Sequence, residues 1–342
     1  MSQKIDGPAL EQWKRLYELM DEIKALAPWE FMYEHNIFGV RFPETVNLGF
    51  VSVMGNLGEH LAVAVYPGKK GLEGFLTMQS MEDELTPEVV LQVPQLQAAL
   101  EDREMITPED RKVIRQLDLK FRGRKAWPQF RSYRPGCFPW YLGREEAQML
   151  IHGLEQLLDV APRFKDNPTL LETDEPDGKY LVRVQEGGTW VDQPQQIKFP
   201  ADPPLQLKLN MDALHDLKSL SKENTIVEIA IQMMEQAVKD NDFDRPYFPF
   251  MLLIAEKQSQ MIVGADLLSP LPSLEAMWEE IPAVVTDLMA SSFLPGEVRV
   301  KDPLLALLLA PLEKELGIKV KLVSHLPTVE HAQREFKRFT GR

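Results

Sequence analysis

The chain has 342 residues, of which 44% are hydrophobic and 26% are charged, and its formal net charge is −14. This length favours two domains, and this composition is typical of an ordinary globular protein that folds in water. The acidic balance argues against a protein that binds nucleic acid over its whole surface, because such a surface is basic.

The first part of the chain predicts an α+β domain over residues 1–165. Its expected elements are a helix over 9–27, a strand hairpin from 48–54 and 61–66, short helices or a connection over 81–105, and helices over 107–117 and 144–160. Thr107 and Pro108 are typical of a helix start, with threonine as the N-cap and proline at the first helical position. The beginning of the chain lacks the basic start and apolar core of a signal peptide, and we therefore expect a cytoplasmic protein.

A polar, proline-bearing segment over 163–178 marks the predicted domain boundary. Residues 166–222 then indicate a connecting region with short strands in KYLVRV, GTWVD and QIKF. The second domain is predicted over 223–342, with strands over 225–233, 249–256, 261–268, 297–300 and 318–323 and helices over 273–293, 304–316 and 328–339. The longest apolar run, at 303–312, is too short to cross a membrane, so no membrane partner is expected.

The order of these last elements, three strands followed by helix, strand, helix, strand and helix, resembles that of ribonuclease-H-like folds. The stretch LLIAEKQSQMIVGADLL, a long helix and PGEVRVKDP together resemble the core of integrases and transposases. The resemblance implies a mixed sheet with flanking helices, and carboxylates that hold two Mg²⁺ or Mn²⁺ ions. Carried onto this sequence, it implies Glu228, Asp302 and Glu335 as the catalytic acids, with Asp302 as the foremost metal ligand.

A second interpretation of Asp302 competes with metal binding. Asp302 directly precedes Pro303 and a run of leucines, a pattern typical of an N-cap whose carboxylate accepts a backbone N–H. The first strand also carries Glu228 where the resembled enzymes use aspartate. We therefore favour a ribonuclease-H-like domain that has lost its metal site and has no cofactor, with Mg²⁺ or Mn²⁺ as the alternative.

Four phrases spread along the chain resemble a bacterial family that pairs two domains of unknown function. They are PWEFMYEHNIFGV, GFVSVMGNLGEHLAVAVYPG, FRGRKAWPQFRSYRPGCFPWYLGREE and RPYFPFMLLIAE. This resemblance covers most of the chain and implies an N-terminal and a C-terminal domain. It implies no activity, cofactor or catalytic residue.

Basic residues are concentrated in one stretch, since residues 111–144 contain ten of them and a single acid, Asp118. Within it, residues 120–144 interleave seven basic with seven aromatic residues, which we expect in an extended loop. Such interleaving can neutralise phosphates and stack bases, as in single-strand recognition. The candidate contact residues are Arg122, Arg124, Lys125, Trp127, Arg131, Tyr133, Arg134 and Trp140. Alternatively, the aromatic residues fill a gap between sheet and helices, and the arginines pair with acids such as those of 81–84.

Other signals of chemistry are weak. The six histidines form no HExxH motif and no paired spacing, so zinc is not expected. We interpret His152 as a hydrogen-bonded core residue and Cys137, which can form no intramolecular disulfide, as a packed thiol.

Together these observations predict a non-catalytic cytoplasmic binding or interaction protein, whose partner is a protein or a single-stranded nucleic acid bound through residues 120–144. Two alternatives remain open. One is a divalent-metal-dependent nuclease or strand-transfer enzyme that uses Glu228, Asp302 and Glu335. The other is a small-molecule binder whose pocket is lined by residues 127–141.

Overall fold

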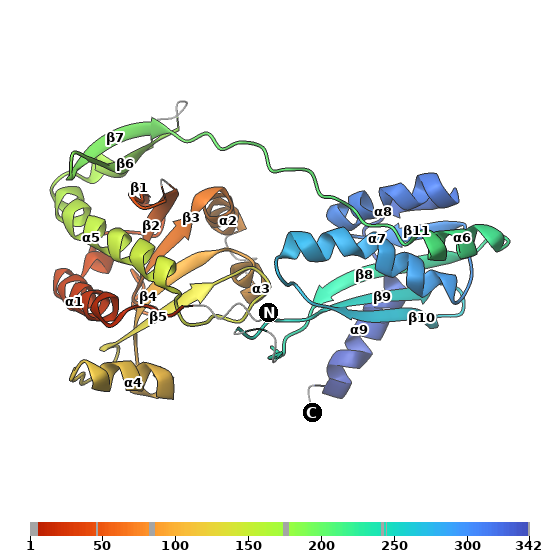
Figure 1. Ribbon diagram of the computed structural model, residues 1–342, viewed down its shortest axis with the longest axis horizontal. Coiled ribbons are helices and arrows are strands. Elements are labelled where there is room, and N and C mark those ends of the chain that lie inside the picture. The colour runs from red at the N-terminus through yellow and green to blue at the C-terminus, as the bar shows by residue number, and fades with distance from the viewer. Residues whose placement is uncertain are drawn as a thin grey trace. The chain divides into compact units, whose positions relative to one another are not determined.

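The computed structural model describes residues 6–45, 47–81, 86–173, 178–240, 243 and 245–340. The chain divides into two compact units, the first formed by Met1–Ala201 with Asp240–Arg245 and the second by Asp202–Lys239 with Pro246–Arg342. Each unit combines one mixed sheet with helices, which confirms the α+β class and the two-domain organisation (Figure 1). None of the helices in the described ranges is both long and apolar enough to span a membrane.

A single sheet forms the centre of the first unit. Its strands are β1 (Phe38–Arg41), β2 (Leu48–Met54), β3 (Ala62–Pro67), β4 (Gln95–Glu101), β5 (Trp127–Tyr133), β6 (Lys179–Glu186) and β7 (Thr189–Gln196). They lie in the order β5-β4-β3-β2-β1-β6-β7, and all neighbours are antiparallel except β1 and β6. The central β2 and β3 are buried on both faces, which explains their nearly continuous apolar sequences.

Helices cover both faces of this sheet. They are α1 (Leu10–Leu26), α2 (Gly68–Met81), α3 (Pro87–Leu91), α4 (Pro108–Gln116) and α5 (Arg144–Asp166), with short 3-10 helices η1 (Pro28–Glu30), η3 (Arg103–Met105) and η4 (Pro168–Leu171). α1 and α5 pack on the face that presents Val51 and Val53, whereas α2 packs on the face that presents Phe50. Gly153 allows α5 to approach β3 closely, because a Cβ atom there would lie 2.5 Å from Cγ2 of Val65.

The second unit has a smaller sheet. Its strands are β8 (Ile226–Met233), β9 (Phe250–Glu256), β10 (Ile262–Leu268), β11 (Glu297–Val300) and β12 (Lys319–Leu322). They lie in the order β10-β9-β8-β11-β12. β8, β9 and β10 form an antiparallel meander, and β11 and β12 run parallel to β8. This arrangement confirms the mixed sheet that the last third of the sequence predicts.

The helices of the second unit divide between the two faces of its sheet. They are α6 (Met211–Ser219), α7 (Leu274–Ala290), α8 (Pro303–Leu316) and α9 (Pro327–Thr340). Leu253 of β9 packs with Val329 of α9, whereas the neighbouring Ile254 lies on the opposite face, where it and Leu288 of α7 both approach Gly264. Figure 1 shows the same division, with α7 and α8 on one side of the sheet and α9 on the other.

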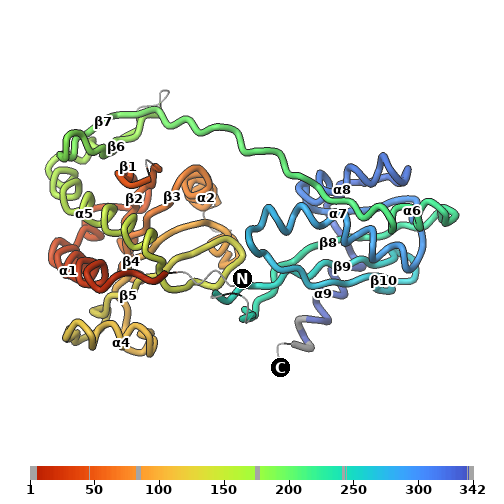
Figure 2. Tube along the Cα trace, viewed as in Figure 1, coloured from red at the N-terminus to blue at the C-terminus, as the bar shows by residue number. Residues whose placement is uncertain are grey.

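The expected connecting region, residues 166–222, is divided between the two units. β6 and β7 extend the first sheet, where Gly39 of β1 pairs with Val182 of β6. Figure 2 shows the green β6 and β7 beside the red β1. α6, by contrast, belongs to the second unit. The sequence shows short strands here but not their partner, because parallel pairing joins segments that are far apart in the chain.

Two expectations for the first unit are wrong. Residues 95–101, expected within short helices or a connection, form β4, and part of the expected extended loop forms β5. In β5 burial alternates from residue to residue, because this edge strand packs only one of its faces on the core.

Candidate functional site

α4 begins just before the basic stretch, and the sequence TPED, which consists of the N-cap Thr107 and the first three residues of the helix, determines where it starts. Oγ1 of Thr107 accepts the N–H of Asp110 at 3.2 Å, and the Asp110 carboxylate accepts the N–H of Thr107 at 3.1 Å. This reciprocal pair is a capping box, and Pro108 occupies the first turn. The helix buries Asp110 and Ile114, which are four residues apart and share one face. Val113 packs partly against the core, whereas Arg111, Lys112 and Arg115 are exposed.

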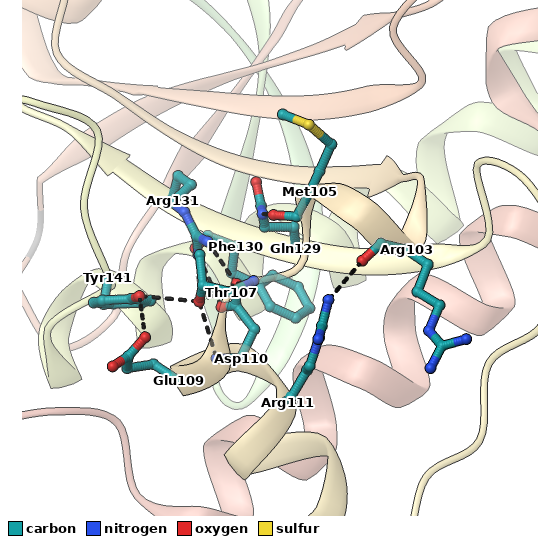
Figure 3. A network of polar contacts seen from close by, with 10 residues as sticks. All are labelled: Arg103, Met105, Thr107, Glu109, Asp110, Arg111, Gln129, Phe130, Arg131 and Tyr141. Carbon is teal, nitrogen blue, oxygen red and sulfur yellow. Dashed lines mark hydrogen bonds and ion pairs between the residues drawn. The ribbon is translucent and has the colours of Figure 1, made fainter.

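Arg131 of β5 holds α4 through a buried ion pair (Figure 3). Its guanidinium donates to both carboxylate oxygens of Asp110, with Nη1–Oδ1 at 3.0 Å and Nη2–Oδ2 at 2.6 Å. Only 12% of the Arg131 side chain and 7% of the Asp110 side chain are exposed. The guanidinium also lies 4.9 Å from the ring centre of Tyr141, whose hydroxyl is 3.0 Å from Oγ1 of Thr107. The two-pronged geometry and the aromatic contact fix α4 against the edge strand.

Aromatic residues of the stretch fill the space between the sheet and α1. Phe130 contacts Trp13 and Tyr17, with ring centres 5.9 Å and 5.1 Å apart. Phe121 stacks on Tyr17 at 5.7 Å and contacts Trp127 at 5.8 Å. These contacts match the interpretation in which the aromatic residues pack inside the protein.

The other two candidate aromatic residues also contact their own unit. The hydroxyl of Tyr133 donates to Oε1 of Gln97 at 3.2 Å. Trp140 contacts the ring of Tyr141, with a distance of 4.9 Å between ring centres. Tyr133 and Trp140 are both half-buried, so they form part of the packing around β5.

Arg134 is a counter-ion for a half-buried acid. It donates to Oε1 of Glu146 through Nε at 3.0 Å and Nη2 at 2.8 Å, and Oγ of Ser132 donates to the same oxygen at 2.8 Å. Burial acts to raise the pKa of Glu146, but Arg134 and the N–H of Gly143 hold it below its usual value. Arg134 thus stabilises the start of α5.

Lys125 and Arg124 differ in their contacts. The ammonium of Lys125 donates to the backbone carbonyls of Gly58 and Glu59. The side chain of Arg124 is 90% exposed and lies 4.0 Å from Asp102. The acids of 82–84, considered as partners for the arginines, lie outside the described residues.

Five cations on and after α4 are exposed and have no carboxylate partner in the described part of the chain. They are Arg111, Lys112, Arg115, Lys120 and Arg122. Arg111 and Arg115 donate only to backbone carbonyls. Within the described ranges, no carboxylate lies within ion-pair distance of any of the five. We call these residues the α4 basic surface.

Only one of the eight predicted contact residues, Arg122, belongs to the α4 basic surface. The signal that could have found the helical members is the capped helix in TPEDRKVIRQL. A helix that buries Asp110 and Ile114 must turn the side chains of Arg111, Lys112 and Arg115 toward solvent.

Two of the candidate acids of the second unit, Glu228 and Glu335, accept hydrogen bonds from different groups. Glu228 of β8 is fully buried, and its Oε2 accepts the N–H groups of Thr328 at 2.8 Å and Val329 at 3.2 Å at the start of α9. Glu335 of α9 accepts from Arg338 at 2.7 Å. Among the residues that the structure describes, no three His, Cys, Asp or Glu side chains are grouped so that they could hold a metal ion.

The third candidate acid, Asp302, is the N-cap of α8. Its Oδ1 accepts the N–H of Leu304 at 2.8 Å, and Pro303 occupies the first helical position. This geometry matches the capping interpretation of the sequence.

The capping role of Asp302 predicts how its variants behave. Asp302→Ala should lower the free energy of unfolding of the second unit by about 1 kcal/mol, because one N–H of α8 loses its acceptor. Asp302→Asn should be nearly neutral, because asparagine caps helices as well as aspartate does. Chemical denaturation of both variants checks this expectation. Equal losses in both, together with an Mg²⁺-dependent stabilisation that only the wild type shows, would contradict the capping role.

Each unit contains a cleft. In the first unit, residues of the segments 31–37, 75–79 and 164–173 and Tyr180 line a cleft of about 800 Å³. In the second unit, a cleft of about 310 Å³ lies beyond the carboxyl end of β11 and alongside residues 229–232 of β8, and it is lined in part by Lys301, Asp302 and Glu330. No residue of the predicted pocket segment 127–141 lines either cleft.

His152 of α5 is hydrogen-bonded, as expected, but it is half-buried between two carboxylates and is not part of the core. Its Nε2 is 3.0 Å from Oε1 of Glu44, and its Nδ1 is 3.8 Å from Oε2 of Glu155. Burial acts to lower the pKa of His152, but its contacts with Glu155 and Glu44 outweigh burial and raise this pKa above the usual value.

We expect the contribution of His152 to stability to fade as the pH rises. Its pKa is higher in the folded chain, so the contribution is complete below the unfolded value of about 6.5 and is lost as the pH rises through the folded-state pKa. The free energies of unfolding of wild type and His152→Gln should therefore differ more at about pH 6 than at about pH 8.5. A difference that stays constant or grows between these conditions would contradict the raised pKa.

Burial also raises the pKa of the Cys137 thiol, although Arg245 and Arg134 act to lower it. The side chain is buried. Cys137 is therefore a packed thiol and not an activated nucleophile.

Comparison with known families assigns most of the chain to two domains. The family model of a domain of unknown function (DUF7309) matches residues 13–183, which is half of the chain. The chain belongs to the DUF7309 family. In this DUF7309 protein the matched region contains the α4 basic surface, and a second domain of unknown function (DUF6930) matches residues 213–337. The expected pairing of two such domains is thereby confirmed. No curated protein matches the chain.

Proposed function

We propose that this protein is a non-catalytic, cytoplasmic binding protein that holds a nucleic acid by its phosphates on the α4 basic surface. The observation that carries the proposal is the set of five exposed cations, on and after one anchored helix, that have no carboxylate partner among the residues the structure describes. In a chain with a net charge of −14, acids are abundant enough to pair with every surface cation. Five neighbouring cations that remain unpaired support a role toward an anionic partner outside the chain.

The packing around β5 supports contact with phosphates rather than with bases. Trp127, Tyr133 and Trp140 contact residues of their own unit, so base stacking on these rings has no support. Cations that contact only phosphates bind a nucleic acid whatever its base sequence is. We therefore expect sequence-independent binding of single strands and duplexes, with a Kd of about 10⁻⁴ to 10⁻⁶ M at physiological salt.

The buried ion pair supports the same proposal through preorganisation. Because Arg131 and Asp110 fix α4 on the edge strand, the backbone that carries Arg111, Lys112 and Arg115 is already ordered before a partner arrives. Little conformational entropy of the backbone is then lost on binding.

We further propose that the second unit is a scaffold without a catalytic metal site. Its strand order supports the resemblance to ribonuclease-H-like folds. Two of the three acids that this resemblance points to, Glu228 and Asp302, accept helix N–H groups, and the third, Glu335, accepts from an arginine. These roles support a scaffold function for the three acids.

Charge-reversal variants test the binding site. We expect Lys112→Glu with Arg115→Glu to weaken binding of a fluorescent oligonucleotide of about 20 nucleotides at least tenfold at low salt, because phosphate contacts dominate non-specific affinity. The matched control, Lys24→Glu with Lys198→Glu, makes the same change in net charge at two exposed lysines of the first unit. Fluorescence anisotropy measures both affinities.

The control separates a local surface from a general charge effect. Equal losses in the two double variants would show that net charge alone matters and would reject the site. Competition by a polyglutamate peptide as effective as that by unlabelled oligonucleotide would reject a nucleic acid in favour of an acidic protein.

A further inference from the structure

We propose that the cleft of the first unit binds a small planar aromatic ligand that carries an anionic group. The cleft lies at the amino ends of the parallel strands β1 and β6, since Ile37 and Tyr180 line it. None of its lining residues belongs to the α4 basic surface, so this site is distinct from the one proposed above. Its volume of about 800 Å³ lies within the range of about 300–1,000 Å³ that small-molecule sites occupy.

The cleft combines buried and exposed apolar side chains. Ile37, Phe75 and Leu171 line it and are buried. Tyr33 and Leu76 line it as well, but they are 50% and 46% exposed. Large apolar side chains that remain exposed in a concave surface provide area that a ligand can cover.

The aromatic part of the ligand is inferred from Tyr33 and His35. Their rings are nearly parallel, at 9°, with centres 5.6 Å apart. The turn that carries them is fixed, because the N–H of Tyr33 donates to Oδ1 of Asn36 at 2.8 Å and the N–H of Asn36 donates to the carbonyl of Tyr33 at 2.9 Å. A preformed pair of stacked rings offers a flat face on which another ring can pack.

The anionic group is inferred from Lys165. Its Nζ lies 5.0 Å from the centre of the Phe31 ring, and across the described ranges no carboxylate is within ion-pair distance of it. The cleft thus contains a cation that has an aromatic contact and, among the described residues, no ion-pair partner. Glu172 also lines the cleft and is exposed. The two residues should act in opposite directions, since Lys165 attracts an anion and Glu172 repels it.

A pair of dyes that differ by one charge tests this inference. The anionic probe is 8-anilinonaphthalene-1-sulfonate, and the neutral probe is N-phenyl-1-naphthylamine, which lacks the sulfonate. We expect Lys165→Gln to weaken binding of the anionic dye roughly tenfold and to leave the neutral dye unchanged, because only the first can pair with the ammonium. Glu172→Gln should not weaken binding of the anionic dye, and it should leave binding of the neutral dye unchanged.

A second pair of variants locates the dyes. Leu76→Asp should abolish binding of both dyes, whereas Leu57→Asp, at an exposed leucine outside the cleft, should change neither. The inference is overturned if neither dye binds the wild type. It is also overturned if the Leu76→Asp variant binds both dyes with wild-type affinity, or if the Lys165→Gln variant binds the anionic dye with wild-type affinity. Oligonucleotide binding should be the same in all four variants, so failure here and failure of the proposed nucleic-acid site are distinguishable.

Discussion

Asp110→Ala should destabilise the first unit by about 3–5 kcal/mol, because it leaves the guanidinium of Arg131 buried without a counter-ion. The pair is nearly closed to water and is joined by two hydrogen bonds, at 3.0 Å and 2.6 Å. Asp110→Ala also removes the acceptor of the Thr107 N–H, so part of the loss comes from the N-terminus of α4. Arg131→Met should lower the free energy of unfolding by a similar amount, since it leaves the carboxylate of Asp110 buried without a counter-ion.

Unfolding in urea, followed by tryptophan fluorescence, measures this loss. All tryptophans except Trp278 lie in the first unit, so the signal mainly reports that unit. The double variant Asp110→Ala with Arg131→Met should lose clearly less than the sum of the two single variants, because no buried charge is left unpaired. Arg124→Met, at an exposed arginine of the same stretch, should cost less than about 1 kcal/mol. A cost of Asp110→Ala no larger than that of Arg124→Met would contradict the buried pair.

Glu228→Ala should destabilise the second unit by about 3–5 kcal/mol. It removes a fully buried carboxylate that accepts the N–H groups of Thr328 and Val329, and hydrogen bonds to a charged group contribute about 1.5–3 kcal/mol each. Glu228→Gln should cost less, about 1–3 kcal/mol, because the amide oxygen can still accept these bonds. Its cost comes from the lost attraction between charge and helix N-terminus and from the amide NH2 group, which is buried without an acceptor within the described ranges. The other carboxylate oxygen, Oε1, has no hydrogen-bond partner among the described residues, so its replacement removes no further contact.

Hydrogen exchange of the amides of α9 shows where Glu228→Ala acts. The helix packs on Leu253 of β9 through Val329, next to the two N–H groups that Glu228 accepts. Loss of the carboxylate should therefore accelerate exchange in α9 more than in α8, which Asp302 caps independently. Unchanged exchange in α9 and wild-type stability would contradict the role assigned to Glu228.

The sequence predicts the second unit better than the first, because its element ends carry local signals. Asp302 with Pro303 begins α8 and Gly317 ends it, and each acts within a few residues. The alternation of strands and helices from β8 to α9 also follows from such signals, so the order of these elements could be read correctly, whereas α6 lies in the expected connecting region and was missed. β4 and the partner of β6 carry no comparable signal, since both depend on pairing with strands that are distant in the chain.

The candidate site could be predicted only in part, because charge counts do not show which cations are already paired. Arg131 is part of the basic stretch, yet its partner Asp110 comes from the capping box of α4. Arg134 is likewise neutralised, by Glu146 of α5. The burial pattern of each element separates the paired arginines from the exposed ones. Arg131 lies in a strand whose residues alternate between buried and half-buried, and it is paired. The cations on the side of the capped helix opposite its buried face are exposed and have no such pair among the described residues.

The salt dependence of oligonucleotide binding tests the account most directly. If the five cations of the α4 basic surface neutralise phosphates, the logarithm of the duplex association constant should fall with the logarithm of salt concentration with a slope of about −4.5. Replacing Lys112 and Arg115 by glutamine should make this slope less steep by about 2. No binding at low salt, or an affinity that is independent of salt, would contradict the central claim.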